Sequence, residues 1–225
     1  MADYSSTTRV GAPMSGYYGQ GDTLTDSVGN VFECFKSGYP GLWQVAAYAT
    51  NVGASPVIAG LKTVIQRDSN IVTLTFTLTA VQMTVTDAGV SGSHAGLKLF
   101  DLNQYAVAIL GARQDYTAFA EGAALTGAAG DAVFEIGVGS VIISAAADGI
   151  LGATNDDICG DVNITNSGGT GAGTLVQGAT AVLDGTTTAV DLNLNWSGTA
   201  VTIDATSTID VTGTIQIVLA LLGDD

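Results

Sequence analysis

The chain has 225 residues, 47% of them hydrophobic, which is enough to bury a sizeable core. Its net charge of −15 comes from 21 acidic residues against six basic ones. Phosphate groups repel such a surface, so direct binding to nucleic acid or to an anionic membrane is not expected.

The N-terminal segment shows little periodicity. Residues 1–30 are rich in Gly, Ser, Thr and Tyr, a composition that favours an extended arm over a packed element. A short strand is predicted over 31–35, a turn at Pro40 and Gly41, and a further strand over 42–50. The predicted organisation is therefore an extended N-terminal arm over 1–30, followed by a single β-sandwich domain over 31–225.

The clearest strand signal begins at Ile71. From Val72 to Leu78 apolar side chains alternate with threonines, and a period of two with one apolar face is typical of a half-buried strand. From Val81 onward the apolar side chains occupy odd-numbered positions, whereas those before it occupy even-numbered positions. An inserted residue would cause this change, so the pattern predicts a β-bulge near Ala80 and Val81.

The rest of the chain continues as short strand patterns. Residues 89–96 predict a loop, and strands are expected over 97–100, 105–110, 133–136, 141–143 and 190–196. Asp184 and Gly185 predict a hairpin turn between two strands. Within residues 209–222, apolar side chains occur at both odd- and even-numbered positions, and so on both faces of a strand. This pattern indicates a central strand covered on both faces. No helical stripe exceeds two turns, so the fold class is all-β, a β-sandwich or jelly-roll-like domain.

Three patterns could carry chemistry, and each has a plainer interpretation. His94 follows a serine, but a nucleophile needs a separate base and an orienting acid, so a solvent-exposed loop histidine is favoured. Asp156, Asp157 and Asp161 could bind a cation such as Ca²⁺, yet their spacing is not that of a calcium loop, which favours a solvated acidic loop. Gly168–Gly173 lacks the lysine of a phosphate-binding loop and is interpreted as a linker. We predict that the protein is not an enzyme and has no catalytic, metal or cofactor site.

The aromatic residues divide into core and contact candidates. Trp196 continues the alternate apolar positions of a predicted strand, so it is expected to point into the core with them. This disfavours a sugar-stacking platform built with Trp43. Tyr17 and Tyr18 stand in a polar segment without a core pattern. Together with Arg9 they are the candidate partner contacts.

The cysteines and the N-terminus bear on the compartment. Cys34 and Cys159 lie far apart and outside any metal-ligand spacing, which favours buried free thiols over a disulfide. The N-terminus is polar, and no uncharged apolar run reaches the ~18 residues that span a bilayer. A soluble protein made in a cytoplasm is expected.

Several segments resemble, in motif and in order, a family of tailed-phage structural proteins. They are Lys98–Leu102 (KLFDL), Ala106–Ala112 (AVAILGA), Leu183–Asn195 (LDGTTTAVDLNLN), Val211–Ile215 (VTGTI) and Leu222–Asp224 (LGD). The resemblance covers about residues 70–225 and brings no catalytic residue. It implies a virion protein on the capsid surface, made in the host cytoplasm, that decorates or cements the shell with the major capsid protein as partner. Such proteins commonly sit on the shell as homotrimers.

Other roles remain open. A tail-tube protein should present a long hairpin for ring stacking, and a major capsid protein is usually longer and carries a long spine helix. A glycan-binding adhesin would be favoured by clustered exposed aromatic side chains. The charge distribution also bears on the partner surface, because residues 1–113 hold all six bases and seven acids, whereas 114–225 hold fourteen acids and no base. We therefore expect shell contact through the near-neutral N-terminal half.

Overall fold

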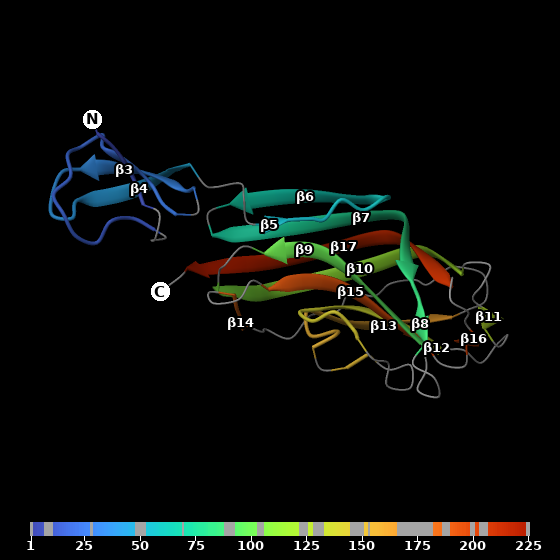
Figure 1. The fold of residues 1–225 in the computed structure, drawn as a ribbon. Coiled ribbons are helices and arrows are strands. Elements are labelled where there is room, and N and C mark those ends of the chain that lie inside the picture. Colours follow the sequence, from blue (N-terminus) through green and yellow to red (C-terminus); the bar gives the residue numbers. More distant parts are fainter. Residues whose placement is uncertain are drawn as a thin grey trace.

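The structure is a computed structural model in which every regular element is a strand across the described residues. These residues are 2–6, 11–27, 29–47, 53–68, 70–87, 93–102, 106–121, 126–127, 133–144, 151–152, 154–165, 182–185, 190–198, 201–202 and 207–223. A five-strand sheet and a six-strand sheet, both antiparallel, pack as a sandwich, and a small sheet stands at the N-terminus (Figure 1). The predicted all-β class is confirmed.

Each large sheet is named by its central strand. The β17 sheet has the order β14-β10-β17-β7-β6, and the β15 sheet has the order β13-β12-β15-β9-β5, with β8 also pairing with β9. The first comprises β6 (Leu61–Asp68), β7 (Ile71–Thr84), β10 (Ala106–Glu121), β14 (Val182–Asp184) and β17 (Thr208–Gly223). The second comprises β5 (Gly53–Ala54), β8 (Thr86–Asp87), β9 (Ser93–Leu102), β12 (Val133–Gly139), β13 (Cys159–Thr165) and β15 (Asp191–Gly198). A separate pair joins β11 (Thr126–Gly127) to β16 (Val201–Thr202).

The strand pairing is that of a jelly roll. Eight strands in chain order, β7, β9, β10, β12, β13, β14, β15 and β17, pair first with eighth, second with seventh, third with sixth and fourth with fifth. This is one long hairpin rolled up so that its pairs alternate between the two sheets. Rolling places four strands of this hairpin in each sheet and buries their facing sides against each other.

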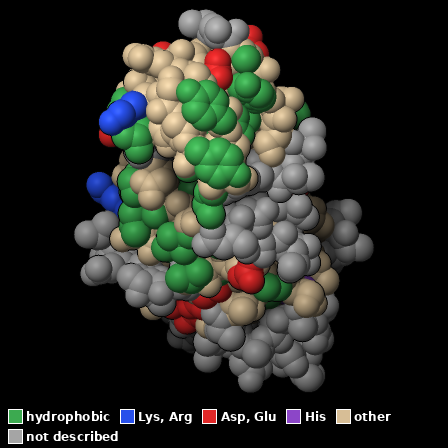
Figure 2. Space-filling view, turned by 90° about the vertical axis from the view of Figure 1, so that its left-hand side faces the viewer, with side chains coloured by type: hydrophobic (Ala, Val, Ile, Leu, Met, Phe, Trp, Pro, Cys, Tyr) green, Lys and Arg blue, Asp and Glu red, His purple; other side chains and the backbone are tan. Residues whose placement is uncertain are grey.

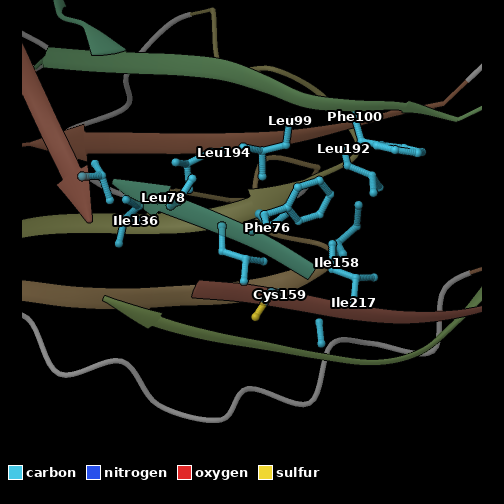
Figure 3. Close-up of a cluster of buried hydrophobic side chains, with 14 of the residues drawn as sticks. Phe76, Leu78, Leu99, Phe100, Ile136, Ile158, Cys159, Leu192, Leu194 and Ile217 are labelled. Carbon is cyan, nitrogen blue, oxygen red and sulfur yellow. The ribbon is translucent and has the colours of Figure 1, made fainter. Parts of the chain in front are cut away.

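The inner faces of the two sheets supply the core (Figure 3). Alternate residues are buried because successive side chains of a strand point to opposite faces. All the labelled side chains are almost completely buried. They are Phe76, Leu78, Leu99, Phe100, Ile136, Ile158, Cys159, Leu192, Leu194 and Ile217. Trp196 is fully buried beside Phe119 and Phe134, which confirms its predicted place in the core.

A buried polar link also joins the sheets. Gln114 of β10 donates from Nε2 to the carbonyl of Gly160 in β13 at 2.6 Å. The Tyr116 hydroxyl donates to Oε1 of Gln114 at 2.7 Å, and burial raises the pKa of Tyr116 well above its usual value. Gln114 therefore keeps partners inside the sandwich, as a buried amide must.

The β-bulge predicted near Ala80 is present. The register of β7 against β17 shifts there, so Thr79 and Ala80 together oppose Thr212. Ala80 adopts a φ of 48°, and its amide donates to Oγ1 of Thr212 at 2.9 Å. Because of the extra residue, the buried positions change from even-numbered to odd-numbered residues, so Leu78 before the bulge and Val81 after it both face the core.

The last strand is central, but it is not covered on both faces. β17 lies between β10 and β7, as predicted. Its outer side chains at Thr214 and Gln216 are exposed, and Leu222 is 49% exposed. The prediction that this strand is covered on both faces was therefore wrong. The apolar outer positions near the C-terminal end of β17 belong to a partly open surface.

The N-terminal residues form a small sheet in place of an extended arm. β1 (Asp3–Ser5) pairs in parallel with β2 (Thr23–Thr25), which pairs with β3 (Val31–Lys36), and β3 pairs with β4 (Leu42–Ala47). Strands before and after residue 30 thus share one sheet, and the predicted boundary does not coincide with a sheet boundary. Side-chain hydrogen bonds between Asp22 and Ala2 and between Asp26 and Gly11 help to hold this sheet together, and such bonds leave no alternating apolar pattern in the sequence.

Two further expectations differ from the structure. Asp184 and Gly185 do not connect a hairpin, because β14 and β15 lie in different sheets. Val141–Ile143 is not a strand. The side chain of Asn195 holds this segment, donating to the Val141 carbonyl at 2.9 Å and accepting from the Ile143 amide at 2.9 Å. An apolar run can thus pack along a sheet without pairing in it.

Candidate partner-contact surface

An aromatic cluster organises the N-terminal sheet. The ring of Tyr18 packs edge-on against Tyr4 and Trp43, with centroid separations of 5.3 and 4.9 Å. The backbone of Tyr18 exchanges two hydrogen bonds of 3.1 Å with Gly38, and the Trp43 indole donates to the Pro40 carbonyl at 3.0 Å. Edge-to-face pairs add about 0.5–1.5 kcal/mol beyond their buried area. The cluster therefore ties the segment before β2 to the turn between β3 and β4.

Two buried aspartates hold the loops around this cluster. Asp22 accepts hydrogen bonds from the amides of Gly19 and Ala2, both at 2.8 Å, and these bonds lower its pKa. Asp26 accepts from the amide and side chain of Asn30 at 2.8 Å and from the amide of Gly11 at 3.0 Å. Carboxylates that satisfy backbone donors in this way fix irregular chain segments without a large apolar core.

Large apolar side chains remain exposed on this small sheet. Among the described residues, six of the thirteen exposed large hydrophobic side chains lie within residues 2–47. They are Tyr4, Met14, Tyr17, Phe35, Tyr39 and Leu42, and we call them the N-terminal apolar surface. Figure 2 shows hydrophobic side chains gathered in the upper part of the molecule, where the N-terminal sheet lies. Exposed apolar groups clustered in this way mark interaction sites.

The candidate contact residues have different roles in the structure. Tyr17 is 73% exposed and belongs to the N-terminal apolar surface. Tyr18 is half-buried, and its ring already packs against Tyr4 and Trp43. Arg9 lies outside the described residues. Their contact with a partner stays a prediction.

Most residues of the N-terminal apolar surface were not predicted from the sequence. Met14 and Tyr39 are 74% and 75% exposed, more than Tyr17, and Leu42 is 51% exposed. Tyr39 precedes the predicted turn at Pro40, and an aromatic residue beside a tight turn is the signal that could have identified it. Leu42 carried no such signal, because its position alone does not show that it opens an edge strand.

Comparison of the chain with protein-family models, with curated proteins and with solved structures finds no match. Over the described residues, no helix is long and apolar enough to cross a membrane.

His94 lies in a strand, and the prediction of an exposed loop histidine was wrong. It belongs to β9, is only 7% exposed, and stands directly opposite Thr86 of β8 and Ser197 of β15. Among the described residues, its Nδ1 and the hydroxyl of Ser197 have no hydrogen-bond partner. Ser93 is its neighbour along the strand and points to the opposite face, so the two cannot act together. The flanking glycines had suggested a loop, but pairing with β8 and β15 extends the strand.

We expect the stability of the protein to fall as the pH drops below about 6.5, the pKa of histidine in an unfolded chain. Burial disfavours the imidazolium and lowers the pKa of His94, so the unfolded state binds the proton first. The stabilising effect is fully present above that pH and is lost as the pH falls towards the folded-state pKa. Urea denaturation at several pH values should show a flatter pH dependence for His94→Gln. If the free energy of unfolding changed with pH in the same way in both proteins, His94 would not be the cause of the pH dependence.

The acidic segment is half-buried and not a freely solvated loop. Asp157 accepts from the amide and hydroxyl of Ser140, both at 2.7 Å. Burial, and then the nearby carboxylates Asp161 and Asp157, raise the pKa of Asp156. Within the described ranges, no three His, Cys, Asp or Glu side chains are grouped to hold a metal ion. Residues 168–173, predicted to be a linker, lie outside the described part of the chain.

Both cysteines are buried thiols that form no disulfide, as predicted. Burial raises the pKa of Cys159 to about 12, so its thiol stays protonated and unreactive at neutral pH. The thiol of Cys34 donates to the Lys36 carbonyl at 3.2 Å inside the N-terminal sheet. Each acts as a small packing residue.

Proposed function

We propose that the protein is a structural virion component that decorates or cements the capsid shell of a tailed phage, with the major capsid protein as its partner. The observation that carries this proposal is the N-terminal apolar surface. Tyr, Phe and Met are enriched at the cores of protein interfaces, where large side chains bury much area. Tyr17, Tyr39 and Met14 are each at least 73% exposed, so a partner could cover them with little rearrangement.

The charge distribution favours contact through the N-terminal sheet. Residues 1–47 contain four acids and two bases, a net charge of −2, so the remaining residues carry −13 of the total −15. Many copies on one particle would repel one another most through the acidic sandwich. An apolar, nearly neutral contact surface avoids bringing that charge against the shell.

The sandwich supports the same role. Jelly rolls recur in viral capsid proteins and in lectin domains, although a fold alone does not decide a function. The segments that resemble tailed-phage structural proteins lie in β9, β10 and β17, with further motifs around β14 and β15. They belong to the body, whereas the apolar surface belongs to the N-terminal sheet. In this proposal the protein binds the shell through the N-terminal sheet and assembles there as a homotrimer, because closed cyclic assembly suits a symmetry axis.

A glycan-binding adhesin is the second candidate, because Tyr17 and Tyr39 are exposed aromatic residues in the segments that connect the strands of the N-terminal sheet. Other virion components, such as a tail tube or a shell protein, share the same fold-level support. Quantitative mass spectrometry of purified virions separates these roles. A decoration protein should be present in many copies that match a set of shell positions, and an adhesin in only a few.

The contact itself is tested by the double variant Tyr17→Ser/Tyr39→Ser. Central aromatic contacts often contribute about 2 kcal/mol or more, so we expect binding to stripped capsid shells to weaken at least about tenfold. Deleting residues 1–22 is a poorer test, because it also removes β1 and the ring of Tyr18.

Val57→Ser is the matched control, since Val57 is a fully exposed apolar residue outside the N-terminal sheet. Both proteins should unfold at the same temperature, because the replaced side chains are exposed. Full binding by the folded double variant would assign the shell contact to another surface.

A further inference from the structure

A polar hollow lies on the outer face of the β17 sheet. Its volume is about 300 Å³, and Arg113, Asp115, Thr214 and Gln216 line it among the described residues. In the pairing of β10 with β17, Arg113 stands directly opposite Gln216, and Asp115 stands opposite Thr214. Opposed side chains on one face have Cβ atoms about 5 Å apart, so these four form a compact square.

The four side chains can both donate and accept hydrogen bonds. Arg113 offers several N–H donors and Asp115 offers carboxylate acceptors, while the amide of Gln216 and the hydroxyl of Thr214 do both. The closest Arg113–Asp115 contact joins Nη2 to Oδ2 at 3.8 Å. This distance is too long for a hydrogen bond, so the ion pair leaves both groups able to bind a ligand.

The electrostatics select the class of ligand. An anion would meet Asp115 and a protein of net charge −15, whereas a divalent cation would find a single carboxylate beside a guanidinium. The lining side chains are polar and together neutral, which disfavours an apolar ligand. A neutral molecule with many hydroxyl groups matches this set of donors and acceptors.

We propose that this hollow is a saccharide-binding site. Its volume is at the lower end of the roughly 300–1,000 Å³ typical of small-molecule sites, so it fits one or two sugar rings. No aromatic ring is among the described lining residues, so affinity depends on hydrogen bonds and is expected in the millimolar range. The site is separate from the N-terminal apolar surface, and either assignment can fail without the other.

The test is titration of the full chain, followed by two-dimensional ¹⁵N–¹H NMR. The probes are glucose, galactose, N-acetylglucosamine and lactose at millimolar concentrations. At least one sugar should shift the amides around Arg113, Asp115, Thr214 and Gln216 in a saturable manner. Arg113→Ala should weaken this binding about tenfold, because hydrogen bonds to a charged group are among the stronger ones.

Lys62→Ala is the control, since it removes one exposed positive charge from the same face of the sheet, on β6, and should leave binding unchanged. Three results would overturn the proposal: no saturable shift with any of the sugars, shifts that map to another surface, or an equal loss of binding in Lys62→Ala. Tighter binding of inorganic phosphate or Ca²⁺ at the same amides would overturn the assignment of a neutral ligand.

Discussion

Replacing Ile217 with aspartate is expected to prevent folding of the sandwich. Ile217 is fully buried in the centre of β17, opposite Leu74 of β7 and Ala112 of β10. An unpaired polar group in such a place costs about 2–7 kcal/mol, and a carboxylate costs more. Domains of this kind have a free energy of unfolding of about 5–15 kcal/mol. We expect Ile217→Asp to be insoluble or to lack a cooperative thermal transition in circular dichroism.

Gln216→Asp is the matched control for this experiment. Gln216 precedes Ile217 in the same strand, but its side chain is exposed on the outer face. Exposed substitutions usually change stability by about 0.5 kcal/mol or less, so this variant should fold. A soluble and cooperatively folded Ile217→Asp protein would show that β17 is not the buried centre of its sheet.

Gly213→Ala should strongly destabilise the same sheet. The backbone of β10 comes so close here that a Cβ would collide with the carbonyl oxygen of Asp115 and lie 2.8 Å from the Cα of Tyr116. Both obstacles are backbone atoms held in the sheet, so they cannot move aside as a flexible side chain can. We expect a loss of about 3 kcal/mol or more in the free energy of unfolding, measured by urea denaturation.

Gly111→Ala tests the same pair of strands without the collision. A Cβ at Gly111 meets no atom within 4 Å. Alanine also restricts the unfolded chain more than glycine does, so this variant should be neutral or slightly more stable. If both alanine variants were equally stable, the close approach of β10 and β17 at Gly213 would be wrong.

Local patterns predicted the elements of the sandwich where one face of a strand is buried. The alternation from Val72 to Leu78 predicted β7 because only one side of that strand contacts the core. The change of parity after it predicted the bulge at Ala80, since an inserted residue is the physical cause of both. These features depend on neighbours along the chain, so the sequence contains them directly.

Pairing between distant strands was not predictable in this way. β17, from the acidic C-terminal half, lies between β7 of the near-neutral half and β10, which spans the boundary between the two halves. The charge asymmetry of the sequence is therefore mixed within the β17 sheet and stays distinct only in the N-terminal sheet. The hollow at Arg113 and Gln216 arises from this interleaving, because residues more than one hundred positions apart become direct neighbours.

The all-β class, the strands with one buried face, the β-bulge and the place of Trp196 in the core could all be predicted from the sequence. The physical reason is that these depend on the alternation of apolar side chains and on backbone chemistry within a few residues. The burial of His94 and the folding of residues 2–47 into a sheet with an apolar surface became visible only in three dimensions. Those outcomes depend on β8 and β15 meeting β9, and on Asp22 and Asp26 binding distant amides. Contacts between separate segments of the chain create them, and no local pattern encodes such contacts.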